Sequence, residues 1–279
     1  MRIKVIVFRT AYWRPGTNYV KVISSLVEGI VQDQDIITVS EKALSVARGS
    51  IVDESRITPS SVARFLSSFW MRRIWGGPLG QITKLKKRTI KRLRNYPSVE
   101  GAAHKQVALR KAGVLQALRH FSEGGIDASN LPYSYVSLPI KDAPHIADTI
   151  RLDIEKRYGI RIVAMIVDGD ATFSFKNLHL APRHVEVEGL VHFGGFLTFV
   201  LGRALHLKQR ATPIAVSGRT FNPDYALTIA EIANRARGYG AGLTVWDMAR
   251  RFKVGINEIT WKMLESVPHR PVVIVRLSE

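Results

Sequence analysis

The strongest structural signal in this sequence is the apolar run Ile160–Val167, which leads directly into Asp168-Gly169-Asp170. It follows the amphipathic segment Ile146–Arg157, whose isoleucines recur at every fourth residue and which ends at Tyr158-Gly159. Isoleucines at this spacing predict one buried helix face, and glycine is the residue that helix C-caps prefer. A continuous apolar run directly after such a helix predicts a strand covered on both faces, as in α/β proteins.

The rest of the chain mixes strand and helix signals. Strands are expected at both chain ends and after the polar residues 32–35, and Gly/Pro breaks separate helical segments. We therefore predict an α/β fold with mixed sheets, with all 279 residues in one unit. The expected strands are 1–8, 36–40, 160–167 and 271–277, and the expected helices include 58–70, 105–121, 226–236, 244–252 and 257–264.

Composition excludes several classes of protein. Hydrophobic residues make up 46% and charged residues 23%, which fits a globular domain with a substantial core. The chain has no cysteine, so disulfides, thiolate metal sites and cysteine nucleophiles are excluded. The apolar stretches are far shorter than the ~20 residues that a membrane-spanning helix needs. These features predict a cytoplasmic protein with no membrane partner.

The positive charge is concentrated in one segment. The chain has a formal charge of +18, and residues 71–120 hold 13 basic residues against the single acidic residue Glu100. We expect this basic helical segment either to meet a polyanion, such as nucleotide phosphates or nucleic acid, or to form a solvated helix surface. Chain order leads from Lys84–Arg94 through His104-Lys105 toward the loop 123–130, which suggests that its later residues line a pocket.

Asp168 and Asp170 form the first candidate site. They follow a buried strand, at the end where α/β folds gather ligands, and Gly169 between them permits close backbone approach. Two carboxylates so placed suit a hard divalent cation that holds phosphate. The alternative is an ordinary Asp-Gly turn that ends the strand.

Two loops add candidates of the same kind. The stretch EGGIDASN contains consecutive glycines, whose backbone N–H groups are free to bind an anion, and Asp127 as a possible metal ligand. Its alternative is an Asx or capping turn. Ser40-Glu41-Lys42 follows the second expected buried strand, where Lys42 either neutralises a phosphate or decorates the surface. No Walker-type glycine loop and no metal-binding histidine pattern occurs.

In order along the chain, these pieces resemble the γ-glutamyl ligase family that extends a deazaflavin coenzyme with glutamate. The loop EGGIDASN resembles the family's Gly-Ile/Val-Asp-x-Ser-Asn loop, with Asp127, Ser129 and Asn130 in place. The resemblance extends from about Asp35 onward and is carried by DIITVSEKALSVARGSIVDESRITPSSVARFL, LPIKDA, RIVAMIVDGDATF and WKMLESVPHRPVVIVR.

Three features depart from the family pattern. The family's Ser-Asp-Thr-Phe-Gly-Arg is replaced by the stretch DGDATFSFK, in which a short insertion restores the aspartate as Asp168 or Asp170. The Asp-Tyr-Arg-Gly signature is reduced to Ser217-Gly218 followed by Arg219. The basic segment 71–95 has no clear counterpart in the family.

The resemblance implies a two-part ligase-like fold with two intertwined subdomains. It also implies a homodimer with the nucleotide in a cleft at the subunit interface. The implied reaction uses GTP and Mg or Mn to convert a carboxylate into an acyl phosphate, which the amine of an amino acid attacks. Three alternatives remain open: a ligase for a different acid, a non-catalytic relative, and a nucleic-acid-binding relative. The implied metal ligands are Asp127, Asp168, Asp170 and Glu231, and the implied nucleotide- or substrate-binding residues are Ser40, Lys42, His104, Lys105, Ser129 and Asn130.

Overall fold

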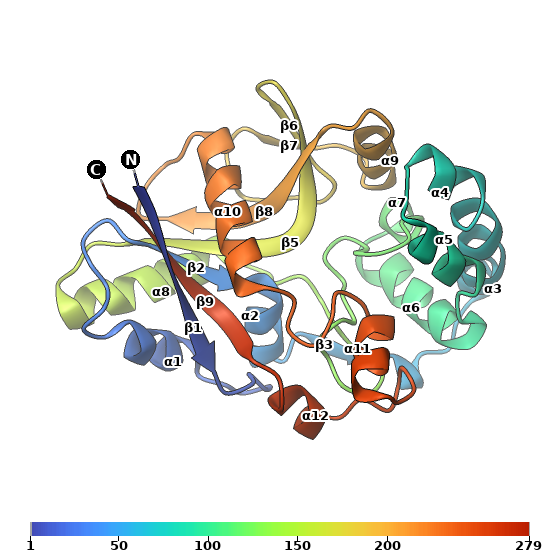
Figure 1. Ribbon diagram of the computed structural model, residues 1–279, viewed down its shortest axis with the longest axis horizontal. Helices are drawn as coiled ribbons and strands as arrows, with labels where there is room; N and C mark the ends of the chain where they lie inside the picture. Colours follow the sequence, from blue (N-terminus) through green and yellow to red (C-terminus); the bar gives the residue numbers. More distant parts are fainter. Residues whose placement is uncertain (1, 279) are drawn as a thin grey trace.

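A mixed sheet forms the centre of the computed structural model, which describes residues 2–278 (Figure 1). Its strands are β1 (Arg2–Thr10), β2 (Ile36–Ser40), β5 (Val163–Phe175), β6 (Leu178–Ala181), β7 (Leu190–His192), β8 (Lys208–Ser217) and β9 (His269–Ser278). The order is β1-β9-β2-β5-β6-β7, and β8 also pairs with β5. β2 and β5 are parallel, whereas β9 is antiparallel to both of its neighbours. A sheet of this kind, packed between helices, confirms the α/β prediction. A separate pair consists of β3 (Ile51–Asp53) and β4 (Tyr135–Ser137).

The helices fall into two groups in space (Figure 1). Those around the sheet are α1 (Tyr19–Val27), α2 (Glu41–Ala47), α8 (Ala143–Tyr158) and α10 (Pro223–Arg237). The second group, at the right of Figure 1, consists of α3 (Ser61–Phe65), the π-helix η2 (Leu66–Trp75), α4 (Pro78–Ile82), α5 (Lys87–Arg94), α6 (Ser98–Lys111), α7 (Val114–Ala117) and α9 (Phe196–Ala204). The remaining helices are the 3-10 turn η1 (Glu54–Arg56), α11 (Val245–Phe252) and α12 (Trp261–Glu265).

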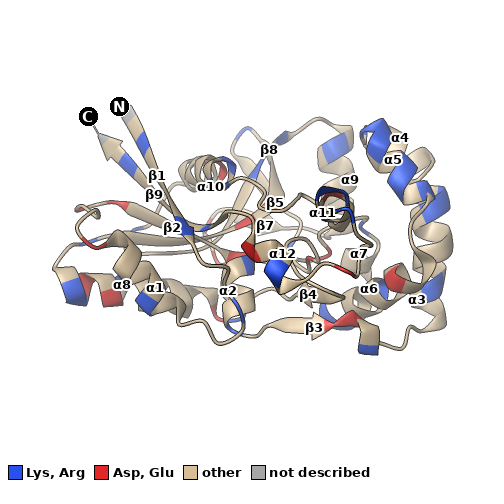
Figure 2. Ribbon diagram, turned by 60° about the horizontal axis from the view of Figure 1, so that its bottom comes forward, with Lys and Arg blue, Asp and Glu red and all other residues tan. Residues whose placement is uncertain are grey.

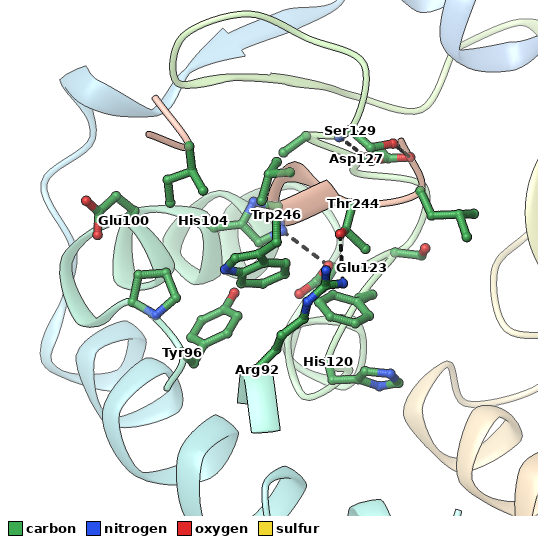
Figure 3. A pocket seen from close by; sticks show the side chains of 18 of the residues that line it. Arg92, Tyr96, Glu100, His104, His120, Glu123, Asp127, Ser129, Thr244 and Trp246 are labelled. Carbon is green, nitrogen blue, oxygen red and sulfur yellow. Dashed lines mark hydrogen bonds and ion pairs between the residues drawn. The ribbon is translucent and has the colours of Figure 1, made fainter. Parts of the chain in front are cut away.

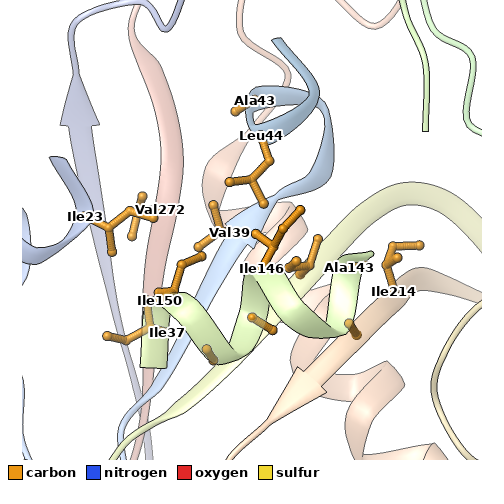
Figure 4. Close-up of a cluster of buried hydrophobic side chains, with 14 of the residues drawn as sticks. Ile23, Ile37, Val39, Ala43, Leu44, Ala143, Ile146, Ile150, Ile214 and Val272 are labelled. Carbon is orange, nitrogen blue, oxygen red and sulfur yellow. The ribbon is translucent and has the colours of Figure 1, made fainter. Parts of the chain in front are cut away.

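Strand alternation divides the core between the two faces of the sheet. Ile37 and Val39 of β2 point toward the face covered by α1, α2 and α8, where Ile146 and Ile150 are also buried (Figure 4). Val163, Met165 and Val167 of β5 point to the opposite face, where they pack with Ala226, Ile229, Ala230 and Ala233 of α10. The sheet is therefore buried on both sides at β2 and β5, as the apolar run of β5 predicts.

β5 continues beyond the point where the sequence predicts its end. Instead of a turn at Asp168-Gly169-Asp170, the strand runs on to Phe175, with a register shift against β8 between Asp168 and Ala171. A bulge of this type bends the strand and re-aims its side chains. Pairing with β8 on both sides of the bulge therefore keeps Asp168-Gly169-Asp170 within the strand, although this short sequence by itself predicts a turn.

The helical group contains most of the basic segment. The indole nitrogens of Trp70 and Trp75 both donate to the carbonyl oxygen of Leu118, at 2.9 and 2.7 Å, and this anchors η2 to the chain that follows α7. Within the basic segment 71–120, predicted to be helical, residues 78–94 form two short helices, α4 and α5. Figure 2 shows Lys and Arg along α5 at the outer end of this group.

Several helix bounds differ from the predictions. The helix expected over 105–121 is divided into α6, which begins earlier at Ser98, and α7, with Gly113 at φ +85° between them. The helix expected from Thr58 begins at Ser61, because the Ser60 hydroxyl rather than Thr58 caps it. The helix expected over 257–264 begins only at Trp261, as α12. Thr260 is its N-cap, since its side chain accepts a hydrogen bond from the backbone N–H of Met263. The helix expected over 244–252 is confirmed as α11, and the Thr244 side chain caps it by accepting the backbone N–H of Asp247. Within residues 2–278, no helix is long and apolar enough to cross a membrane.

Candidate functional site

The ends of β2 and β5 open into a pocket of about 220 Å³. The two strands are parallel, with Ser40 opposite Val167, so the residues that follow both strands meet at one sheet edge. The pocket brings together seven of the predicted site residues: Ser40, Lys42, Asp127, Ser129, Asn130, Asp168 and Asp170. The main predicted constellations, about 40 residues or more apart in sequence, therefore share one cavity.

Lys42, Asp127 and Ser129 form a polar cluster at one wall of the pocket. The Lys42 ammonium forms an ion pair with Asp127 and lies 2.6 Å from the Ser129 hydroxyl. Asp127 Oδ1 also accepts the backbone N–H of Ser129 at 2.6 Å, which makes this loop the Asx turn that was its alternative interpretation. Lys42 is only about one quarter exposed. It is thus a pocket residue, held by the loop rather than free on the surface.

Asp168 is held by a buried ion network behind the pocket. Arg183 Nη1 lies 3.0 Å from Asp168 Oδ2 and 2.6 Å from Glu41 Oε2, while its Nη2 lies 2.7 Å from Glu41 Oε1. Glycine is favoured at position 125 because φ is +92°, and a Cβ there would also lie 2.2 Å from Arg183 Nη1. Glu41, a neighbour of Lys42 in the predicted phosphate motif, therefore points away from the pocket and anchors this network.

Asp170 differs from its neighbour because its carboxylate is not fully satisfied. Its Oδ2 atom is buried without a hydrogen-bond partner, and the nearest cation, Arg119, lies 3.7 Å away. Burial, together with the charge of Asp168, raises the pKa of Asp170 to about 7. A buried unpartnered carboxylate at a pocket wall is a candidate for contact with a ligand or a cation.

Asn130 holds the loop that forms the opposite wall. Its Nδ2 donates to Gly242 O at 3.0 Å, and its Oδ1 accepts the Ala241 N–H at 2.7 Å. Gly240 has φ +57°, and a Cβ there would lie 2.5 Å from Asn130 Oδ1. The side chain of Asn130, predicted to bind nucleotide or substrate, is thus engaged in holding the glycine-rich loop 238–242.

Comparison with known proteins places this site in a family context. Residues 8–190 match the family described as F420-0:gamma-glutamyl ligase, and this range includes Lys42, Asp127, Asp168 and Asp170. The chain belongs to the γ-glutamyl ligase family. An uncharacterised protein of Methanocaldococcus jannaschii is 30% identical over 288 residues, which cover 97% of this chain and 95% of the relative. The family supports a ligase activity and a link to coenzyme F420 biosynthesis.

The candidate site also contains residues that the sequence analysis did not select. Arg237 is the last residue of α10 and lines the pocket, where it donates to Asn234 Oδ1 at 2.7 Å. Burial lowers the pKa of Arg237 to about 10. Tyr12 and Arg270 complete the lining from the two ends of the chain. The basic end of a helix followed by Gly238, Gly240 and Gly242 is the sequence signal that points to this wall.

His104 and Lys105 lie outside this pocket. His104 Nδ1 is 2.8 Å from Glu54 and its Nε2 is 3.2 Å from Glu123, while Lys105 Nζ is 2.5 Å from Glu123. Burial opposes the charged imidazole, but the two carboxylates outweigh it and raise the pKa of His104 to about 10. Lys105 is fully buried, so its charge is met by Glu123 and not by a ligand. His104 lines a second, larger cavity.

Glu231 also lies outside the pocket. Its carboxylate accepts the backbone N–H of Ala211 at 2.8 Å and pairs with Arg235 at 2.5 Å. It therefore joins α10 to β8 and is not among the residues that line the pocket.

Proposed function

We propose that this protein is a GTP-dependent ligase that joins a carboxylic acid to the amine of an amino acid through an acyl phosphate. The observation that carries the proposal is the convergence of Lys42 and Asp127 with Asp168 and Asp170 in one pocket, at the ends of two parallel strands. In α/β folds this sheet edge is where phosphate-bearing ligands bind. Membership of a ligase family supports the same reaction class.

The pocket has the charges that phosphoryl transfer requires. Lys42, Arg237 and Arg270 provide positive charge around the walls that hold the three aspartates. In the proposed reaction, a carboxylate oxygen of the acid attacks the γ-phosphorus and the bond to GDP breaks. The amine then attacks the acyl carbon, phosphate leaves with the C–O bonding pair, and the ammonium formed loses a proton. Cations fixed near the transferred phosphoryl group stabilise its charge.

The donor set fits a hard divalent cation. Asp127, Asp168 and Asp170 are the candidate oxygen donors in the pocket. Oδ2 of Asp170 has no hydrogen-bond partner, and its ion pair with Arg119 is long, at 3.7 Å. In the described part of the chain, three or more His or acidic side chains nowhere cluster closely enough to hold a metal ion by themselves. A site that Mg or Mn shares with nucleotide phosphates needs only one or two carboxylates. When bound, the cation would screen the phosphate charges.

We also propose that the protein is a homodimer. Apolar side chains are exposed along β7 and α9: Val191, Phe193, Leu197, Leu201 and Leu205. β7 is also an outer strand of the sheet, since it follows only β6 in the strand order. Exposed apolar side chains beside an open strand edge favour an interface with another copy of the chain.

Calorimetric titration tests the proposed ligase. GTP and ATP are titrated into the protein with Mg, with Mn and with excess chelator. We expect GTP to bind with a divalent cation and to bind at least ~tenfold more weakly without it, a difference of about 1.4 kcal/mol. Absence of cation-dependent binding of either nucleotide would contradict the proposal.

A further inference from the structure

Three hollows on this molecule adjoin one another and share lining residues. The candidate site and a cavity of about 520 Å³ share Ser122, Asp127, Ser129 and Leu243. That cavity and an open hollow at the surface share Arg88, Arg92 and Trp246. A ligand that fills the middle cavity therefore contacts Asp127 and Ser129 at one end and the arginines of α5 at the other. Figure 3 shows Asp127 and Arg92 on opposite sides of this cavity.

The middle cavity suits an apolar, ring-sized ligand body. Trp246 packs with Phe121 and Tyr96, at ring-centroid distances of 5.7 and 6.2 Å, and all three side chains line the cavity. Its volume lies within the range of about 300–1,000 Å³ for small-molecule sites, which bury an apolar ligand surface against a few polar groups. The cavity is thus large enough for a small molecule that also contacts Asp127 and Ser129, which the cavity shares with the candidate site.

The outer hollow has more positive charge than the neighbouring carboxylate of Asp247 neutralises. It is lined by Arg88, Lys91, Arg92 and Arg250, with Asn95 and Trp246. Asp247 pairs with Arg88 and lies 2.7 Å from Arg92. Neither Lys91 nor Arg250 forms an ion pair within residues 2–278. Four cations around one carboxylate favour an anionic ligand.

Most basic side chains of α5, together with Lys86 directly before it, line the middle cavity or the outer hollow. Lys86, Arg88 and Arg92 line the middle cavity, and Lys91 joins the two arginines at the outer hollow. Nucleic-acid binding would instead use a continuous basic surface that follows a phosphate backbone. Positive charge concentrated at the mouth of a cavity favours a small anionic molecule over nucleic acid.

We propose that the acid substrate carries a second anionic group, remote from the carboxylate that is activated, and that the outer hollow binds it. Arg88, Lys91, Arg92 and Arg250 contact this group, while the apolar body of the substrate lies against Trp246. The assignment of the ligand as the acid substrate rests on the proposed ligase function. The anion site itself rests on the adjoining hollows, their shared lining residues and their charges.

Two fluorescent probes test the site without knowledge of the substrate. Anilinonaphthalene sulfonate combines an apolar ring system with one anionic group, and phenylnaphthylamine has the same rings without the charge. The double variant Lys91→Gln/Arg250→Gln removes the two cations that have no carboxylate partner. The matched control, Lys87→Gln/Arg251→Gln, removes equal charge from the same two helices at exposed positions that line none of the three hollows.

We expect the first double variant to weaken sulfonate binding roughly three- to twentyfold, the effect of losing two exposed charge contacts, and to leave phenylnaphthylamine binding unchanged. The control should leave both unchanged, and Trp246→Leu should weaken both. Equal loss in the two double variants, or no loss in either, would overturn the proposal. So would tight binding of a single-stranded RNA that both double variants weaken equally.

A GTP titration of the wild-type protein separates this proposal from the ligase proposal. A wild-type protein that binds no GTP contradicts the ligase, while the sulfonate probe still reports on the anion site. If the protein binds GTP but the Lys91→Gln/Arg250→Gln variant binds the sulfonate probe as tightly as the wild type, only the proposal of a second anion site is contradicted. The Lys91→Gln/Arg250→Gln variant should keep its GTP affinity, because neither residue lines the candidate site.

Discussion

Asp127 is the residue on which the proposed nucleotide site depends most. Its side chain is about one third exposed and contacts Lys42 and Ser129, so the variant Asp127→Ala should fold. We expect this variant to bind GTP with cation at least ~tenfold more weakly, because one oxygen donor is lost. Calorimetry and circular dichroism measure affinity and folding. The control is Glu188→Ala, an exposed carboxylate outside the pocket; a folded Asp127→Ala protein with wild-type affinity would exclude the assignment.

His104 makes the stability of the protein depend on pH. Its pKa is raised from 6.5 to about 10 by Glu54 and Glu123 against the effect of burial. The charged imidazole therefore stabilises the fold fully below pH 6.5, and this contribution is lost as the pH rises through about 10. We expect the melting-temperature difference between wild type and His104→Gln to shrink between those values. His145→Gln, at an exposed histidine without a carboxylate partner among the described residues, should show no such trend; a constant difference for His104→Gln would refute the effect.

Helix α8 has one face buried in the core and one face exposed to solvent. Ile146 is 1% exposed and packs in the core beneath the sheet, whereas Leu152 is 53% exposed. We expect Ile146→Ala to lower the free energy of unfolding by about 2–5 kcal/mol, since it leaves a cavity in a packed core. Leu152→Ala should change it by no more than ~0.5 kcal/mol. Urea denaturation measures both, and similar values for the two variants would show that α8 does not pack as described.

At the scale of the whole molecule, the β7–α9 surface is the proposed contact between subunits. Leu201 is 48% exposed in the middle of α9, and a glutamate there would place a charge in the interface. We expect sedimentation equilibrium to give a dimer for the wild type and a monomer for Leu201→Glu. Leu152→Glu, also exposed but on α8, should remain dimeric. A monomeric wild-type protein would refute the proposal.

Sequence patterns predicted the parts of this protein that depend on neighbouring residues. The apolar run of β5 and the four-residue spacing in α8 each predict an element that the structure contains. The motifs around Lys42, Asp127 and Asp168 also follow from local sequence, because each stands directly after a predicted strand or glycine turn. Parallel pairing of β2 with β5 then brings them together at one edge.

Only the tertiary structure determines which partners the remaining charged side chains contact. His104 and Lys105 have the residue types of a phosphate site, but Glu54 and Glu123 reach them from other segments and satisfy them internally. Glu231 accepts the backbone N–H of Ala211 in β8, and Arg237 lines the pocket although the sequence analysis did not select it. Local sequence determines which backbone conformation is favourable, because its causes lie within a few residues. The partner of a charged side chain depends on which distant segments pack together, and that choice is made only when the sheet and helices assemble.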